Sequence, residues 1–139
     1  MTIIMDASAL NDFLARDFPQ TAGQFVVQAV NDALLTMRMP VDDRNLRPGG
    51  TVSGPSMFAL ADVAVYCAVL ARIGPVALAV TTNASIDFMR KPTAGRDLIA
   101  ECRLLKLGRL LAVGDVLIWS QGDDQPVARA SMTYAIPPK

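Results

Sequence analysis

The sequence predicts an α+β fold in which one long apolar helix is wrapped by a curved antiparallel sheet. The first observation is the stretch from Met57 to Ile73, which is apolar on nearly every face of a helix, so other structure has to surround it. The second is the chain after this stretch, which is rich in β-branched residues and divided by short turns. Short turns favour antiparallel pairing, and such a sheet can cover the helix on several sides. With 139 residues, the chain fits one domain spanning residues 1–139.

Two segments precede the apolar helix. Leucine and phenylalanine at helical spacing predict a helix over residues 7–17, which Pro19 ends. Residues 24–39 alternate apolar and polar side chains in their second half. This pattern predicts either one half-buried strand or two strands in a hairpin that turns at Asn31 and Asp32. Residues 40–50 are rich in charged side chains and glycine and predict a loop.

Start and stop signals bound the apolar helix. Ser53 is a favourable N-cap, and Pro55 is tolerated in a first turn, where its missing N–H is not needed. Gly74 and Pro75 supply the stop signal. Strand-like segments follow at residues 76–90, 97–107, 110–120 and 126–136, and residues 106–109 and 121–124 predict hairpin turns between the last three.

Charge and composition exclude several classes of function. Thirteen basic residues balance thirteen acidic ones, whereas nucleic-acid-binding proteins normally show a basic face and electrostatic membrane anchors a basic cluster. The sequence contains no histidine, which excludes Ser-His-Asp and Cys-His catalysis and most zinc sites. Balanced charge with 52% apolar residues also fits a protein that buries surface in an oligomer.

The sequence indicates a soluble, cytoplasmic protein. Its N-terminal segment lacks a basic start followed by an apolar block, so we do not expect a signal peptide. Asp62 and Arg72 interrupt the long apolar run, which we expect to fall short of a bilayer span. Cys67 and Cys102 lie far apart within apolar runs, which predicts small buried side chains in a reducing compartment rather than a disulfide.

Asp62 is the candidate catalytic residue. It is the only acidic residue between Asp43 and Asp87 and lies two turns into the apolar helix. An unpaired carboxylate there is costly, so it has to find donors, become protonated or face a wet cleft. A structural aspartate bonded across a subunit contact is the alternative, but acids of this kind concentrate at active sites. Gly54 lies eight residues earlier, about 12 Å along a helix axis, so we expect the two to meet on one substrate only across a twofold between subunits.

Gly54 is the second candidate. First-turn N–H groups have no partner within a helix and lie at the positive end of its dipole. They can stabilise the oxyanion that forms when a thioester carbonyl is attacked. The alternative, that residues 53–55 only cap the helix, is equally compatible with the sequence.

These residues resemble a known family. The segment RPGGTVSGPSMFALADVA is similar to the central motif of phenylacetic-acid-degradation type (PaaI-type) hotdog thioesterases, which runs Asn-x-x-Gly-x-x-His-Gly-Gly, then six residues, then Asp. Gly50 falls on the first glycine, Ser53 on the histidine, Gly54 on the middle glycine and Asp62 on the acid. Downstream, VTTNASIDFMRKPTAG resembles the family strand that ends in Phe-x-Arg-Pro, and VARASMTYAIP resembles the closing strand. The resemblance covers nearly the whole chain from about residue 24.

The resemblance implies a hotdog fold and hydrolysis of acyl-CoA thioesters without a metal or redox cofactor. It also implies a homodimer, or a homotetramer built as a dimer of dimers. By position, the Gly54 N–H would polarise the thioester carbonyl. Asp62 of the opposing subunit would act as nucleophile or as general base for water, and the sequence leaves both roles open.

Three residues depart from the family motif: Ser53 replaces its histidine, Pro55 its second glycine and Arg47 its asparagine. Ser53 can still donate a hydrogen bond to substrate or water, and Pro55 removes one N–H at the helix start. Arg47 can pair with Asp62 and hold it ionised, or grip a carboxylate or phosphate of the substrate.

Further candidates come from the strands and turns. In relatives, the position of Thr81 and Thr82 faces the acyl end, although threonine is ordinary in a strand. Arg90, Lys91 and Arg109 lie near strand ends and a turn, where they would suit CoA phosphates, although each alone is more often a solvated surface charge.

Two other functions fit parts of the pattern. Ser53 and Arg47 leave open a non-catalytic acyl-CoA-binding or regulatory module with the same fold. A hotdog hydratase is discounted because those enzymes rely on a histidine and this chain has none.

Overall fold

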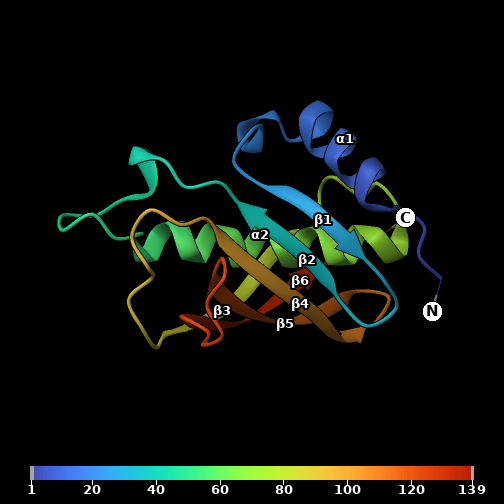
Figure 1. The fold of residues 1–139 in the computed structure, drawn as a ribbon. Coiled ribbons are helices and arrows are strands. Elements are labelled where there is room, and N and C mark those ends of the chain that lie inside the picture. The colour runs from blue at the N-terminus through green and yellow to red at the C-terminus, as the bar shows by residue number, and fades with distance from the viewer. Residues whose placement is uncertain (1, 139) are drawn as a thin grey trace.

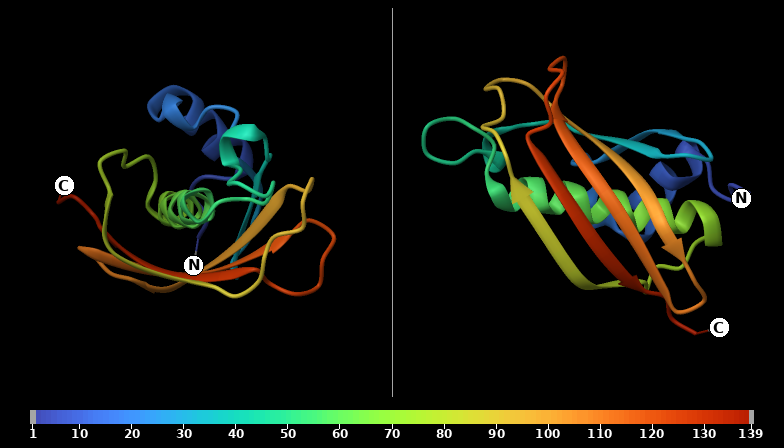
Figure 2. Two further views of the ribbon diagram at one scale, coloured as in Figure 1. Left: turned by 90° about the vertical axis from the view of Figure 1, so that its left-hand side faces the viewer. Right: turned by 90° about the horizontal axis from the view of Figure 1, so that it is seen from below.

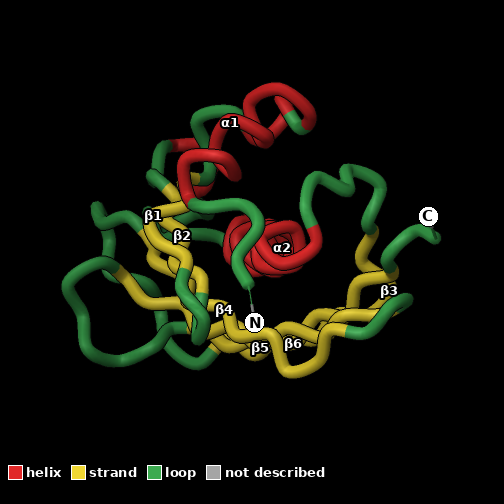
Figure 3. Tube along the Cα trace, turned by 90° about the vertical axis from the view of Figure 1, so that its right-hand side faces the viewer, coloured by secondary structure: helices red, strands yellow, loops and turns green. Residues whose placement is uncertain are grey.

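The computed structural model describes residues 2–138 and contains one curved six-stranded antiparallel sheet in the order β1-β2-β4-β5-β6-β3. Helix α2 runs along the concave face of this sheet, and α1 lies beside α2 near β1 (Figures 1, 2 and 3). The predicted architecture is therefore confirmed. In chain order, the elements are α1 (Ala7–Asp17), a 3-10 helix (Pro19–Thr21), β1 (Val26–Val30), β2 (Leu35–Met39), a second 3-10 helix (Asp43–Asn45), α2 (Gly54–Ile73), β3 (Val80–Phe88), β4 (Leu98–Leu107), β5 (Leu111–Ser120) and β6 (Ala128–Ala135).

Helix α2 forms the centre of the core and has the predicted boundaries. The Ser53 side chain accepts a hydrogen bond from the Ser56 N–H, and Gly74 ends the helix with a φ of 92°, a conformation that favours glycine. The expectation that this segment is too short for a bilayer is wrong, because the helix begins at Gly54 and its 20 residues are long and apolar enough. However, 67% of the apolar stretch of this helix is buried inside the protein, as in the core helix of a globular domain.

The N-terminal helix is attached to the first edge of the sheet. Asp6 caps α1 by accepting from the Ala9 N–H at 2.9 Å. The Asn11 amide then makes two hydrogen bonds of 2.9 Å with the backbone of Val27 in β1. These bonds satisfy backbone groups of Val27 on the outer side of β1 and fix α1 over that edge.

Residues 24–39 form the hairpin rather than the single strand. The Asn31 side chain accepts from the N–H groups of Ala33 and Leu34, at 2.8 and 3.0 Å, and closes the turn between β1 and β2. Among the later segments, only residues 76–90 are notably shorter as a strand, because β3 begins at Val80. The two predicted turns join β4 to β5 and β5 to β6, as expected.

The inner face of the sheet packs on α2, while its far edge is uncovered. Strands β5 and β6 alternate buried and exposed residues in the period of two expected of a sheet with one face in the core. Strand β3 differs, because seven of its nine residues are exposed and none is buried. As the last strand in the sheet order, β3 has an open hydrogen-bonding edge.

Both cysteines are free and buried, as predicted. Burial raises the pKa of the Cys102 thiol to about 12 and raises that of Cys67 further, so neither is a reactive thiolate at neutral pH.

Candidate active site

The Asp62 carboxylate is held by two hydroxyl groups from the sheet. The Thr81 hydroxyl at the start of β3 donates to Asp62 Oδ1 at 2.5 Å, and the Tyr134 hydroxyl near the end of β6 donates to the same oxygen at 2.8 Å. Asp62 Oδ2 accepts no hydrogen bond from a described residue, and Asp62 is only partly buried. Every buried side-chain oxygen of the described residues has a hydrogen-bond partner. Since Oδ2 has none, it is not buried and is open to solvent.

Asp62 faces a small cleft of about 390 Å³ beside the start of β3. The wall includes three aromatic rings, of which Phe18 and Tyr66 meet edge to face with centroids 5.8 Å apart, and Tyr66 and Tyr134 lie 6.0 Å apart. The Tyr66 hydroxyl donates to the Ala77 carbonyl at 3.0 Å and not to the carboxylate. The cleft therefore presents the free oxygen of Asp62 beside three aromatic rings, and Asp17 also lies in its wall.

Both tyrosines remain protonated near neutral pH. Burial, followed by the negative charge of Asp62, raises the pKa of the Tyr134 phenol well above its usual value. Burial also raises the pKa of Tyr66 to about 12. The Tyr134 hydroxyl is consequently a stable donor to the carboxylate.

Gly54 lies in a second cleft, of about 420 Å³, at the start of α2. Its N–H has no hydrogen-bond partner among the described residues, as expected for the first turn of a helix. The ring of Phe88, at the end of β3, packs against Gly54, since a Cβ there would lie 3.2 Å from the ring Cζ. The aligned peptide dipoles of α2 place partial positive charge at this free N–H.

Three predicted cationic residues line the same cleft as Gly54: Arg47, Arg90 and Lys91. Arg90 also donates to the Pro126 carbonyl at 3.0 Å, which ties it to the segment before β6. Arg47 makes no ion pair with a described residue and lines the Gly54 cleft, whereas Asp62 lines the other cleft. Of the two roles expected for Arg47, only contact with a ligand at this cleft fits the single chain.

Gly50 shapes the loop that carries Arg47. The Gly50 N–H donates to the Arg47 carbonyl at 3.0 Å, and the Arg47 N–H donates to the Thr51 carbonyl at 2.9 Å. Gly49 and Gly50 close this turn with φ values of 101° and 82°, which other residues rarely adopt. Gly50 thus positions Arg47 through the backbone.

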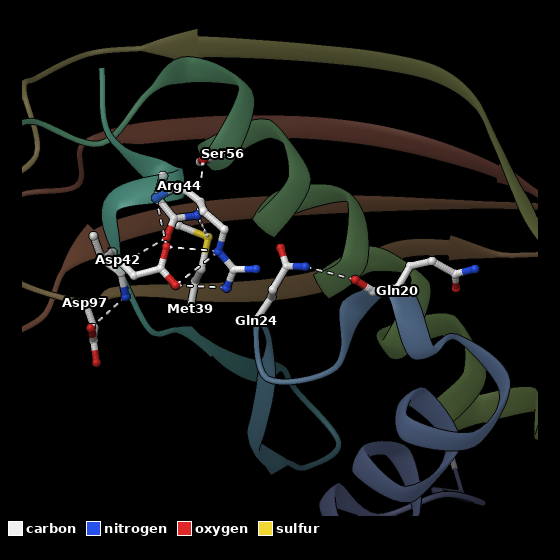
Figure 4. A network of polar contacts seen from close by, with 9 residues as sticks. Gln20, Gln24, Met39, Asp42, Arg44, Ser56 and Asp97 are labelled. Atoms are coloured by element: carbon white, nitrogen blue, oxygen red, sulfur yellow. Dashed lines mark hydrogen bonds and ion pairs between the residues drawn. The ribbon is translucent and has the colours of Figure 1, made fainter. Parts of the chain in front are cut away.

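A polar network fastens this loop to α2 (Figure 4). The Asp42 carboxylate accepts from the backbone and the guanidinium of Arg44, with contacts between 2.9 and 3.3 Å. Asn45 then bridges the loop and the helix: its Oδ1 accepts from the Asp42 N–H at 2.9 Å and its Nδ2 donates to the Ser56 hydroxyl at 3.4 Å. The loop that carries Arg47 is therefore joined to the first turn of α2.

Ser53, Thr82 and Arg109 are placed differently from the other candidates. The Ser53 hydroxyl is engaged with Ser56, whose N–H it accepts at 3.3 Å and whose hydroxyl it contacts at 3.1 Å. Thr82 is exposed and donates only to the Thr133 carbonyl, at 3.4 Å. Arg109 lines a separate cleft of about 970 Å³ beside Arg72, near the other end of α2.

The sequence did not identify Tyr134 as a site residue. A usable signal existed, because Tyr134 is one of only two tyrosines and continues the apolar alternation of Ala130 and Met132 in a predicted strand. A tyrosine that points into a core usually needs a partner for its hydroxyl. Its pairing with Asp62, however, depends on the register between β6 and β3.

The chain is similar to known thioesterases. A family model described as the thioesterase superfamily matches residues 49–127. A candidate thioesterase from Silicibacter sp. is similar at 60% identity over 99% of this chain and 96% of its own, with a TM-score of 0.93. A comparison with curated proteins found no match.

Two more distant structures are also similar. A mutant of the phenylacetic acid degradation protein PaaI from Thermus thermophilus is 27% identical over 86% of this chain and 99% of its own, with a TM-score of 0.73. A protein from Streptococcus mutans, solved with bound acetyl CoA, is 26% identical over 83% of this chain and 90% of its own, with a TM-score of 0.71.

Proposed function

We propose that this chain, which belongs to the thioesterase superfamily, hydrolyses acyl-CoA thioesters through Asp62 and the Gly54 N–H. The chain is a thioester hydrolase with a PaaI-type hotdog fold. The observation that carries the proposal is the Asp62 carboxylate, which two hydroxyl groups hold by one oxygen while the other stays open to a cleft. The bound acetyl CoA of the Streptococcus mutans protein supports a CoA ester as the substrate. A non-catalytic binding module, considered above for Ser53 and Arg47, has no observation in its favour.

The chemistry needs an electrophile and a group that acts on water. The free Gly54 N–H would donate to the thioester oxygen and stabilise the negative charge that develops there. As general base, Asp62 Oδ2 would take a proton from water while the water oxygen bonds to the carbonyl carbon. Collapse of the tetrahedral intermediate breaks the C–S bond, and the CoA thiolate takes the proton back. As nucleophile, Oδ2 would instead bond to the carbonyl carbon and expel the CoA thiolate, which breaks the C–S bond and leaves an anhydride. Water then hydrolyses the anhydride to the free acid and the Asp62 carboxylate, and the proton released passes to the thiolate.

We propose that the two halves of the site come from two subunits of a homodimer, which can pair further into a tetramer. Within one chain, Gly54 and Asp62 line separate clefts and lie about 12 Å apart along α2. Strand β3 links them, because Thr81 near its start contacts Asp62 and Phe88 at its end covers Gly54. Antiparallel pairing of two β3 edges about a twofold would bring the start of one strand to the end of the other.

The surrounding residues support a CoA nucleotide on one side and an aromatic or medium-length acyl group on the other. Arg47, Arg90 and Lys91 would contact CoA phosphates beside Gly54. The aromatic wall of the Asp62 cleft would hold an aryl-acetyl or medium-chain group, and similarity to PaaI supports an aryl-acetyl substrate and a place in phenylacetic acid degradation. Arg109, between β4 and β5, lines a different cleft near the C-terminal end of α2. It would contribute to this site only across a subunit contact.

The other candidates have smaller roles in the proposal. Thr81 would orient the carboxylate, whereas Thr82 is exposed and would contact substrate only at a subunit interface. Ser53 would donate to substrate or water only by releasing Ser56. We also propose a cytoplasmic location, supported by two free, buried cysteines.

A CoA-ester panel tests the proposal. Purified protein is incubated with aryl-acetyl and acyl CoA esters of increasing length, and free thiol is measured for wild type, Asp62→Asn and Asp124→Asn. Asp124 lies in an exposed turn outside both clefts, so its variant makes the same chemical change away from the site. We expect thiol release by wild type and Asp124→Asn and none by Asp62→Asn. Full activity in Asp62→Asn would remove Asp62 from the mechanism.

Subunit complementation tests the shared site. Asp62→Asn and Gly54→Val, each inactive alone, are mixed, unfolded and refolded together. If each site joins Gly54 of one subunit to Asp62 of the other, every mixed dimer has one intact site, and activity returns to about a quarter of wild type. If both groups act within one chain, each subunit carries a defect and the mixture stays inactive.

A further inference from the structure

The two hydroxyl groups at Asp62 both bind one carboxylate oxygen. Thr81 and Tyr134 donate to Oδ1, and no described residue donates to Oδ2. An aspartate carboxylate rotates broadly about its last torsion, so on a helix it has no fixed orientation of its own. Two donors on the same oxygen remove that freedom and turn the other oxygen outward.

We infer that Tyr134 is a positioning residue, which holds the Asp62 carboxylate in the orientation that presents Oδ2 to the substrate cleft. The inference rests on the proposed function of Asp62. It adds a residue of β6 to a site otherwise built from α2, β3 and the loop before α2. Tyr134 acts through Asp62 and not on the thioester itself.

The sheet register places the two donors together. Thr81 of β3 and Tyr134 of β6 are direct partners in the antiparallel ladder. Directly opposed residues have Cβ atoms only about 4.5–5.5 Å apart, so a short and a long side chain from this pair reach the same atom. The ladder then skips Thr82, which is exposed.

The Tyr134 hydroxyl is also fixed relative to the helix backbone. Its oxygen lies 2.8 Å from Asp62 Oδ1 and 3.0 Å from the Asp62 main-chain carbonyl oxygen. Its single hydrogen serves one of these acceptors at a time, and both belong to the same residue. The phenol thus keeps a donor beside Asp62 whether the carboxylate is charged or has just taken a proton on Oδ2.

Tyr134→Phe tests this role because it removes one oxygen atom and keeps the ring. We expect kcat to fall on the order of 10-fold to 100-fold, the effect of a misplaced reacting group, with KM nearly unchanged. Tyr66→Phe is the matched comparison: Tyr66 lines the same cleft, but its hydroxyl binds the Ala77 carbonyl. Tyr66→Phe should therefore lower kcat far less than Tyr134→Phe, and any change should fall mainly on KM.

The outcomes separate this inference from the proposed function. If Asp62→Asn is inactive but Tyr134→Phe behaves like Tyr66→Phe, the positioning role is refuted and the proposed function stands. If Asp62→Asn is active, the proposed function itself fails. Should Tyr134→Phe not fold, Thr81→Val and Thr81→Ser test the same oxygen: a lower kcat with Val and recovery with Ser support the inference, and equal activity of the two overturns it.

Discussion

Replacing Gly114 with alanine tests how closely α2 has to approach the sheet. Gly114 lies in the middle of β5, pairs with Met132 of β6 and faces α2. A Cβ there would lie 2.9 Å from both Cγ atoms of Val65 and 3.4 Å from the Cys102 sulfur. Optimal separations between carbon atoms are about 3.5–4.0 Å, so the added methyl overlaps both branches of Val65.

The overlap cannot be relieved by a side-chain rotation. Val65 is fully buried, and a β-branched residue in a helix has one strongly preferred rotamer. Helix and sheet therefore have to separate, and we expect Gly114→Ala to lower the free energy of unfolding by about 1–3 kcal/mol. Activity should fall as well, because Val65 lies one turn after Asp62 and the movement would lengthen the 2.8 Å bond from Tyr134.

Urea unfolding of the wild type, Gly114→Ala, Val65→Ala and the double variant measures the loss of stability. Val65→Ala alone should cost roughly 1–3 kcal/mol for two buried methyl groups. If the clash is real, Val65→Ala makes room for the methyl group added at position 114. The double variant should then lose about as much free energy of unfolding as Val65→Ala alone. Independent effects would instead add to roughly 2–6 kcal/mol. Additive costs, or a Gly114→Ala protein as stable as wild type, would refute the reasoning.

The remaining predictions concern the two clefts. Gly54→Ala should change the free energy of unfolding by less than about 1 kcal/mol, because Phe88 is 52% exposed and can move aside, while kcat/KM falls about tenfold as the ring shifts into the cleft. Arg47→Ala should raise KM for CoA esters about twofold to fivefold, the value of an exposed ion pair, and this difference should shrink in high salt. Near-ultraviolet titration of the native protein should show no tyrosinate near pH 10, since burial raises the pKa of both tyrosines; a phenolate signal at that pH in folded protein would contradict this. Because the pKa of Tyr66 is about 12 in the folded state and about 10 in the unfolded state, its neutral phenol contributes stability below pH 10. This contribution to stability in urea should be lost as the pH rises from 10 through about 12.

The fold could be predicted because each element carries a local signal. The apolar helix is bounded by Ser53 and Gly74, and the last three strands are separated by polar turns with glycine. The comparison with a bilayer span failed because it used only the apolar run from Met57, whereas the helix begins at Gly54. The first hairpin stayed undecided because the turn depends on the Asn31 side chain, which binds backbone groups only once the chain has folded back.

The site could be predicted only in part, for a physical reason. Asp62 stands out because a carboxylate in an apolar helix is costly, and that cost is visible in the sequence. The partners that reduce the cost come from the sheet, and sequence spacing contains no information on which strand lies opposite which residue. Thr81 and Thr82 are adjacent, yet Thr81 bonds to Asp62, while Thr82 has no partner in the ladder and is exposed.

Strand β3 connects the two halves of the proposed site. Its start carries Thr81 at the Asp62 cleft, its end carries Phe88 at the Gly54 cleft, and its outer edge is open along the whole length. An open edge, a free helix N–H and an unbound carboxylate oxygen each leave a polar group without a partner among residues 2–138, and all three adjoin this one strand. Antiparallel pairing of β3 with its own copy would satisfy the edge and, by the same symmetry, would set the helix start of each subunit against the carboxylate of the other. Pairing of the two β3 edges would thus extend the sheet and also assemble the proposed active site. Substitutions that block β3 pairing should therefore abolish hydrolysis while each chain keeps its fold.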